Sequence, residues 1–354
     1  MLGSALFISV NEISHWHFLQ MTFKQFIIAT VLLFSLTFSA RNYGAHLLQV
    51  DDSYTVAERF VRNQKNYPEI SWPTMSFTQG QQWMNDVPYR QVEGRELHLD
   101  VFLPGDAAKK AQMERRTAIL LVHGGGWRSG NKSHFYPMAN KLAQLGYVVV
   151  LPEYRLSVEA QYPAGLNDIN HAIIWAKQHA EELGFEPSRM VIGGGSSGGQ
   201  MAALQGVTAD TDVFKQGLTA QDTSVAAIID LDGVLDFTSA LGLANENAKG
   251  EESAAALWFG GSYEKIPQRW HEASAASHIN AATPPMLVIS SSHLRFTAGK
   301  EQVFEQLQQL GIPHQYHEFK QLFHTFWLFD PYLSQTVKLT DQFLKRHMPA
   351  PEVK

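Results

Sequence analysis

Residues 190–202 constrain the fold of this chain more than any other segment. They read MVIGGGSSGGQMA, an apolar run followed by glycines, two serines and small residues. The apolar run predicts a buried strand, and the residues after it predict the start of a helix. A Gly-x-Ser-x-Gly sequence at a strand-to-helix turn is typical of a nucleophile elbow, where glycines leave room for neighbouring backbone. The segment therefore predicts a serine hydroxyl that projects from the carboxyl end of a strand.

Two serines satisfy this pattern. Ser196 lies between Gly194 and Gly198, and Ser197 has glycines at the same offsets. We favour Ser196 as the nucleophile, because a small residue and a glycine pair follow it at the expected helix start. A flexible glycine loop and a phosphate-binding loop are the alternatives. A phosphate-binding loop of the P-loop type would need a Gly-Lys-Ser/Thr sequence, and this segment contains no lysine.

Strand-like and helix-like segments alternate along the chain. Strands are predicted at residues 95–104, 117–122, 147–154, 190–195, 225–231, 285–290 and 314–319. Apolar residues at three- and four-residue steps predict helices over 166–183, 303–310 and 333–344. This alternation predicts an α/β fold with a mostly parallel sheet covered on both faces. Residues 234–284 lack the alternation, apart from a short helix near 254–258, and are predicted to form an insertion over the carboxyl edge, where ligands of α/β folds bind.

A second glycine-rich turn follows the predicted strand at 117–122. Residues 123–127 read HGGGW. In acyl transfer the carbonyl oxygen becomes an oxyanion, which backbone N–H groups stabilise from hydrogen-bond distance. Glycines allow the main chain to approach that closely, so the predicted donors are the N–H groups of Gly125, Gly126 and Ser197. His123 is expected to have a structural role.

The predicted general base is His324. It lies in the loop after the last predicted strand, and it follows the serine in the order that this kind of catalytic site uses. The chain has fifteen histidines, so position rather than residue type selects this one. The chain has no cysteine and no His-Glu-x-x-His sequence, and we expect neither a metal nor another cofactor.

The acidic partner of the base is less directly indicated. The loop after the predicted strand 285–290 has no Asp or Glu before Glu301, which belongs to the next predicted helix. The neighbouring strand ends at Asp232, which Gly233 follows, so Asp232 is our candidate for orienting the imidazole. Asp236 and Glu301 are the alternatives, and a role for Asp232 in capping a loop is a further one.

From about Val87 to His347 the chain resembles the bacterial and fungal feruloyl- and acetyl-esterase-like branch of the α/β-hydrolases, near the hormone-sensitive-lipase-like esterases. The matching stretches are His123–Trp127, Tyr154–Ser157, Pro163 with Asp168, Gly194–Ala202 and the region of His324. The resemblance implies an α/β-hydrolase fold, with Ser196 and His324 as the catalytic pair and a structural Asp168. Leu294 stands where the usual acid would be Asp, so the resemblance does not supply that acid. Asp232 resembles the relocated carboxylate of some lipases.

Together these features predict a serine carboxylic ester hydrolase that forms an acyl-enzyme. The resemblance implies acetyl or feruloyl esters of small molecules or oligosaccharides as substrates. A sugar or phenolic ring could stack on aromatic side chains, although each is more typical of a core residue; the candidates are Trp127, Trp258, Phe259, Trp270 and Trp327. The alternatives are a peptidase or lactone hydrolase with the same triad, and a hydrolase-like binding protein without activity.

The sequence before residue 81 predicts export. From Met21 a lysine, an apolar run over Phe26–Phe38 and small residues at 39–40 follow the layout of a secretory signal peptide. The run is shorter than the roughly 18 residues of a membrane span. Residues 1–20 are interpreted as an upstream start, 41–80 as an N-terminal extension and 81–350 as the catalytic domain. The net charge of −6, without clusters of Lys and Arg, argues against nucleic acid as a partner.

Overall fold

The computed structural model describes residues 51–349, except residues 52, 93, 112–116, 216, 217 and 219–222. The predicted signal peptide and the residues upstream of it lie outside the described residues. Within the part of the chain that is described, no helix combines the length and the apolar character that crossing a membrane requires.

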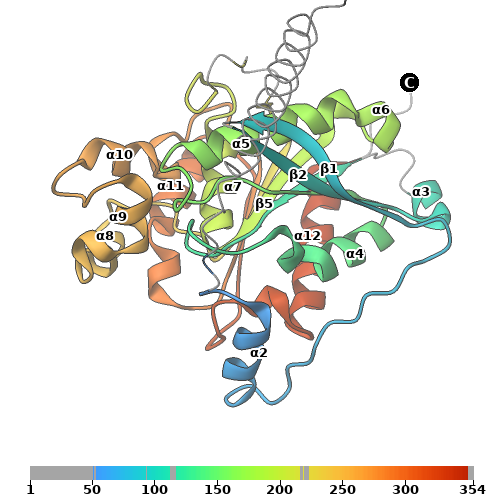
Figure 1. Ribbon diagram of the computed structural model, residues 1–354, viewed down its shortest axis with the longest axis horizontal. Coiled ribbons are helices and arrows are strands. Elements are labelled where there is room, and N and C mark those ends of the chain that lie inside the picture. The colour runs from blue at the N-terminus through green and yellow to red at the C-terminus, as the bar shows by residue number, and fades with distance from the viewer. Residues whose placement is uncertain are drawn as a thin grey trace, which may run out of the picture. The chain divides into compact units, whose positions relative to one another are not determined.

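Eight strands form one sheet in the order β1-β2-β4-β3-β5-β6-β7-β8. Their bounds are β1 Gln82–Val92, β2 Arg95–Leu103, β3 Ala118–Val122, β4 Val148–Pro152, β5 Met190–Gly195, β6 Ala227–Leu231, β7 Met286–Ser290 and β8 His314–Glu318. The pairs β1–β2 and β2–β4 are antiparallel, and all the other pairs are parallel (Figure 1). The predicted mostly parallel sheet is therefore confirmed. Strand β1 was not expected, because its side chains are largely half-buried or exposed and leave a weak apolar pattern.

Helices cover both faces of this sheet. Side chains of β3 point alternately to the two faces, so that Ala118, Leu120 and Val122 join one apolar cluster while Ile119 and Leu121 join the other. The first cluster includes α5 (Ala164–Gln178), α6 (Ala180–Leu183), α7 (Ser197–Val207) and α11 (Lys300–Gln309). The second cluster includes α4 (Tyr136–Gln144) and α12 (Tyr332–His347). A further short helix is α3 (Asp106–Ala111).

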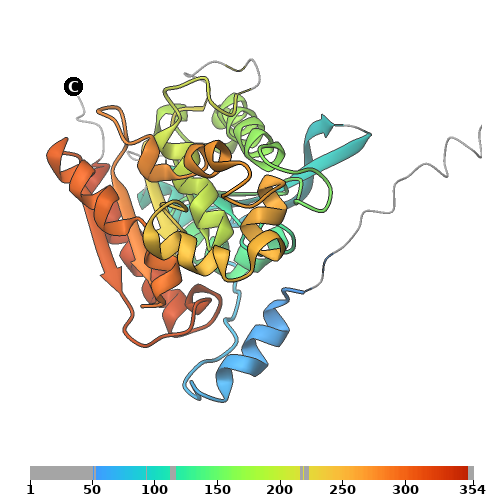
Figure 2. The ribbon, with the colours of Figure 1, turned by 90° about the vertical axis from the view of Figure 1, so that its left-hand side faces the viewer.

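Three helices lie between β6 and β7, in the segment predicted as an insertion. They are α8 (Ala240–Asn247), α9 (Ala254–Phe259) and α10 (Pro267–Glu272), and Figure 2 shows them on the side that faces the viewer. The sequence indicated only the helix near 254–258. The other two were missed because they bury few apolar side chains: α8 buries Gly242 and Glu246, and α10 buries Trp270, so neither displays an apolar period.

The N-terminal extension contains helix α2 (Val56–Gln64), which the sequence analysis did not predict. Thr55 caps it by accepting a hydrogen bond from the Glu58 N–H at 3.3 Å. Phe60 is buried and packs edge-on against Phe329 with ring centroids 5.3 Å apart. The extension is thereby packed against the segment that leads from β8 to α12.

Candidate active site

Ser196 occupies a strained turn between β5 and α7. Its φ is 58° and its ψ is −126°, a conformation that L-residues rarely adopt. A Cβ added at Gly194 would lie 2.3 Å from the Gly198 oxygen, and one at Gly198 would lie 2.1 Å from the Val122 oxygen. Both glycines are therefore required for the turn. Ser197, in contrast, is the first residue of α7 and its side chain is buried. The geometry singles out Ser196 as the serine of the elbow.

A chain of hydrogen bonds joins Ser196 to His324 and Asp232. The Ser196 Oγ lies 2.8 Å from His324 Nε2, and His324 Nδ1 lies 2.9 Å from Asp232 Oδ2. In the tautomer that carries its proton on Nδ1, the imidazole donates to the carboxylate and accepts from the hydroxyl. This arrangement can remove the hydroxyl proton during attack on an electrophile.

Asp232 is held by the ends of two neighbouring strands. It follows β6, is fully buried, and has a φ of 54°. Its Oδ1 accepts hydrogen bonds from the Ser290 hydroxyl at 3.0 Å and from the Ser291 N–H at 2.8 Å. Oδ2 is therefore left for the imidazole. Since a buried carboxylate needs such partners, these contacts also fix the direction in which Asp232 points.

The two alternative acids lie in other surroundings. Asp236 Oδ1 accepts from the backbone N–H and the hydroxyl of Thr238, both at 2.7 Å, and so stabilises a turn. Glu301 is on α11 with its side chain 79% exposed, and it pairs with Lys300 at 3.5 Å. Their positions make them poor partners for a buried imidazole.

The loop after β7, whose sequence has no carboxylate before Glu301, places an aromatic ring beside the catalytic histidine. Phe296 stacks on the imidazole of His324 with ring centroids 3.5 Å apart and an interplanar angle of 6°. Leu294, in the same loop, is 71% exposed. Burial lowers the pKa of His324, and the hydrogen bond to Asp232 opposes that change. The imidazole is therefore neutral at neutral pH, as a general base must be.

The HGGGW turn forms a wall beside Ser196. Gly125 has a φ of +138°, and a Cβ there would lie 2.0 Å from the Ser129 oxygen, so only glycine fits. The Trp127 Nε1–H donates to Gln200 Oε1 at 2.9 Å and ties the turn to α7. Within the described part of the chain, the N–H groups of Gly125, Gly126 and Ser197 make no hydrogen bond to a protein acceptor. All three residues line the cavity that contains Ser196.

His123 and Asp168 are integrated into the scaffold. Burial lowers the pKa of His123 to about 3, and its ring stacks on Tyr154 with centroids 4.5 Å apart. Asp168 is fully buried and accepts from Arg155 Nε at 2.9 Å and Nη2 at 3.1 Å. It also pairs with Arg90. These contacts agree with the structural roles expected for both residues.

The cavity beside Ser196 has a volume of about 660 Å³. Its walls come from the HGGGW turn, the His324 loop, the segment between β6 and β7, the loop after β7, and the N-terminal extension. Trp127 lines it, but the other four aromatic candidates are at most 2% exposed and belong to the core, as is more typical of such residues; they are Trp258, Phe259, Trp270 and Trp327. Phe259 packs against Trp258 and Trp270 within the insertion, whereas Trp327 belongs to the apolar cluster on the other face of the sheet.

Sequence reasoning missed the wall formed by the N-terminal extension. Tyr54, Arg59, Arg62 and Tyr67 all line the cavity. The sequence held one usable signal, since Thr-x-x-Glu at 55–58 is a capping-box pattern that predicts a helix start. Among the described residues, no cluster of three or more His, Asp or Glu side chains is placed to hold a metal ion.

Asp230, which lies under the site in β6, gives a prediction about stability. Burial raises its pKa to about 8 from 3.8. The folded protein therefore holds a proton that the unfolded chain releases, and this contribution to stability is lost as the pH rises through that interval. Asp230→Asn removes this titrating group. The melting temperature of the variant, relative to that of the wild type, is therefore expected to be higher at about pH 8 than at about pH 5. Scanning calorimetry of both proteins at the two pH values measures this change. A difference in melting temperature that does not depend on pH would contradict a protonated Asp230 carboxyl in the folded protein.

Comparisons with known proteins find a matching family model and several similar proteins. A family model described as BD-FAE matches residues 99–295, more than half of the chain. The probable carboxylic ester hydrolase LipM of Mycobacterium tuberculosis is 30% identical over 213 residues, which are 58% of this chain and 46% of that protein. The esterase LipQ of the same organism is 29% identical over 226 residues, 63% and 51% of the two chains. The chain thus spans about half the length of these relatives.

Solved structures have the same fold. Esterase 2 of Thermogutta terrifontis with bound butyrate has a TM-score of 0.61 and 24% identity, over 78% of this chain and 96% of that one. A truncated carbohydrate esterase from gut microbiota has a TM-score of 0.60 and 20% identity, over 78% of this chain and all of that one. At these identities the likeness concerns the fold.

Proposed function

Because the chain belongs to the BD-FAE family of α/β-hydrolases, near the hormone-sensitive-lipase-like esterases, we propose that it is a serine carboxylic ester hydrolase. Family membership and the strand order confirm the predicted α/β-hydrolase fold. The observation that carries the proposal is the hydrogen-bonded series of Ser196, His324 and Asp232, which opens into a cavity beside free glycine N–H groups.

The proposed reaction has two steps. His324 Nε2 takes the Ser196 proton while Oγ attacks the carbonyl carbon, and the N–H groups of Gly125, Gly126 and Ser197 stabilise the oxyanion. Asp232 stabilises the imidazolium. The first tetrahedral intermediate then collapses: the bond between the carbonyl carbon and the alcohol oxygen breaks, the imidazolium gives its proton to the leaving alcohol, and the acyl-enzyme remains. A water molecule, deprotonated by the same imidazole, attacks the acyl-enzyme, and collapse of the second intermediate releases the acid and restores the serine hydroxyl.

We propose acetyl or feruloyl esters of small molecules or oligosaccharides as the substrate class. The names of two similar proteins support this, since LipM is a probable carboxylic ester hydrolase and a structural neighbour is a carbohydrate esterase. The cavity of about 660 Å³ lies in the range of sites for small organic ligands.

A comparison of ester and amide substrates tests the activity. The purified protein is expected to hydrolyse p-nitrophenyl acetate and butyrate much faster than aminoacyl p-nitroanilides. Faster cleavage of the anilides would point to a peptidase. If the protein hydrolyses none of the p-nitrophenyl esters, the acetylated and feruloylated oligosaccharides or the lactones, a binding protein without activity is favoured.

The pKa of His324 sets the expected pH dependence. The base acts only when neutral, so kcat/KM for an uncharged ester falls as the pH drops through the pKa of the imidazole. Since burial lowers that pKa, the midpoint is expected below the ordinary value of 6.5. Rates with p-nitrophenyl butyrate at constant ionic strength locate this midpoint. A midpoint above 6.5 would contradict the surroundings described for His324.

We also propose that the protein is exported to the periplasm or beyond the cell, as residues 21–40 predict. Cell fractionation followed by N-terminal sequencing tests this proposal. A mature chain that begins near residue 41 in the exported fraction is the expected result, and an uncleaved chain confined to the cytoplasm would reject it.

A further inference from the structure

The cavity beside Ser196 carries positive charge although the chain as a whole is acidic. The formal net charge of the chain is −6. Among the described residues, five cationic side chains line the cavity and no Asp or Glu does; the cations are Arg59, Arg62, Arg128, Lys249 and Arg295. A cleft with charge of one sign on its walls raises the local concentration of ligands of the opposite sign. The distribution therefore favours a negatively charged ligand.

Carboxylates behind the cavity wall compensate two of these cations. Arg128 pairs with Asp51 through its Nε. Arg295 pairs with Glu246 at 2.7 Å, and Glu246 is almost fully buried. The other three cations have no ion-pair partner within the described ranges of the chain. The cavity thus keeps positive charge that no described carboxylate compensates.

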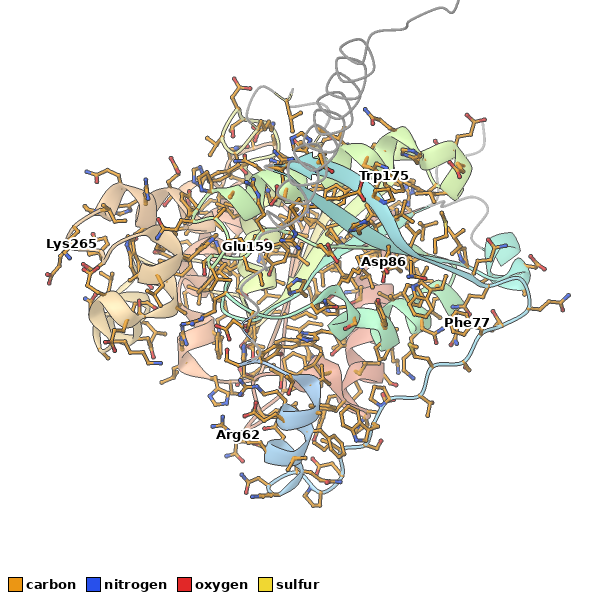
Figure 3. The ribbon with its side chains drawn as sticks, in the orientation of Figure 1. Arg62, Phe77, Asp86, Glu159, Trp175 and Lys265 are labelled. Atoms are coloured by element: carbon orange, nitrogen blue, oxygen red, sulfur yellow. The ribbon has the colours of Figure 1, made fainter. Side chains whose placement is uncertain are left out.

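Helix α2 concentrates this uncompensated charge with other hydrogen-bond donors. The guanidinium of Arg59 lies over the ring of Tyr54, 4.9 Å from its centroid, and its Nε is buried without a partner among the described residues. Arg62, which Figure 3 labels, is three residues after Arg59 on α2, a spacing that places the two residues next to each other on the helix surface. Asn63 and Asn66 line the same cavity. Guanidinium groups and amides together match the geometry of a carboxylate.

The helix is fixed relative to the catalytic base. Phe60 on α2 is buried against Phe329, and the Tyr67 hydroxyl donates to the Gln321 oxygen at 2.9 Å. Gln321 lies three residues before His324 in the same loop. A group bound by α2 would therefore be held at a defined position relative to the imidazole.

We infer that α2 forms a subsite for an anion and that the preferred substrate is an ester that bears a carboxylate. This inference rests on the proposed ester hydrolysis, because the subsite lines the cavity that Ser196 faces. The carboxylate binds Arg59 and Arg62 while the ester carbonyl lies at Ser196. Its charge can belong to the acyl part or to the alcohol part of the ester.

Two matched pairs of substrates distinguish these sources. For the acyl part, p-nitrophenyl hydrogen glutarate is compared with p-nitrophenyl valerate, which has the same chain length without the charge. For the alcohol part, 4-acetoxybenzoate is compared with its methyl ester. In one of the pairs the wild type is expected to favour the anionic member by about tenfold in kcat/KM at low ionic strength. Raising the salt from about 0.05 M to about 0.5 M is expected to remove most of that preference.

The Arg59→Gln, Arg62→Gln double variant tests the residues. It is expected to lower the anionic-to-neutral ratio of kcat/KM about tenfold, chiefly through KM. Lys65→Gln is the matched control, because Lys65 ends the same helix, is exposed and does not line the cavity. It makes the same charge change as one of the two substitutions and is expected to keep the ratio within about twofold.

Preference for the neutral member in both pairs would overturn the inference, and so would a ratio that neither salt nor the double substitution changes. If the double variant does not fold, the salt series on the wild type still tests whether the cavity favours the anionic ester through its positive charge. If the neutral esters are hydrolysed in a reaction that depends on Ser196, but the anionic esters are not preferred, the inferred subsite is contradicted and the proposed ester hydrolysis still stands. Hydrolysis of none of the four substrates would count against the proposed function itself.

Discussion

Ser196→Ala is expected to lower kcat for p-nitrophenyl ester hydrolysis by about 10⁴-fold or more, because no other group can take the place of the attacking oxygen. The glycine turn and the cavity stay intact in this variant, so KM is expected to change little. Initial rates with p-nitrophenyl butyrate, together with the melting temperature of the variant, measure the effect on a folded protein.

Ser197→Ala is the matched control for that result. It removes the neighbouring hydroxyl, which is buried, but keeps the backbone N–H assigned to the oxyanion. A loss of less than about tenfold is expected, since the donor survives the substitution. A larger loss in Ser197→Ala than in Ser196→Ala would exchange the roles of the two serines.

The second large effect is expected at Asp232. Asp232→Asn should lower kcat by about 10⁴-fold, because an amide favours the wrong tautomer of His324 and does not stabilise the imidazolium. Removing the carboxylate also removes a contact that raises the pKa of His324. The pH midpoint of the residual activity is therefore expected to move lower. The pH profile of kcat/KM, measured beside that of the wild type, tests both effects.

Glu301→Gln is the control for the acid. Its side chain is largely exposed on α11, so the variant is expected to keep most of the wild-type kcat. The opposite pattern, a large loss in Glu301→Gln with activity retained in Asp232→Asn, would reject Asp232 as the partner of the base.

Local patterns were sufficient for the central part of the fold. The apolar run of β5, its glycines and the small residues of α7 are adjacent in the sequence, and each follows from steric requirements that the sequence itself displays. The buried parallel strands were recognised for the same reason, since residues buried on both faces form continuous apolar runs.

Other parts depend on contacts that a sequence does not display. Asp232 and His324 are 92 residues apart, and their meeting depends on the pairing of β6 with β7, which places the Ser291 N–H beside the carboxylate. The cavity wall from α2 depends on Phe60 packing against Phe329, a contact between the two ends of the described chain. A helix as short as α2 is marginally stable by itself and takes its position from tertiary packing.

Covalent labelling with a fluorophosphonate, followed by mass spectrometry of the peptides, tests the central claim most directly. Such a reagent phosphonylates a serine that an adjacent base activates. One adduct is expected, on Ser196, formed much more slowly in a His324→Ala variant and absent in Ser196→Ala. An adduct on a different serine, or ester hydrolysis by a protein in which Ser196 stays unlabelled, would contradict the claim.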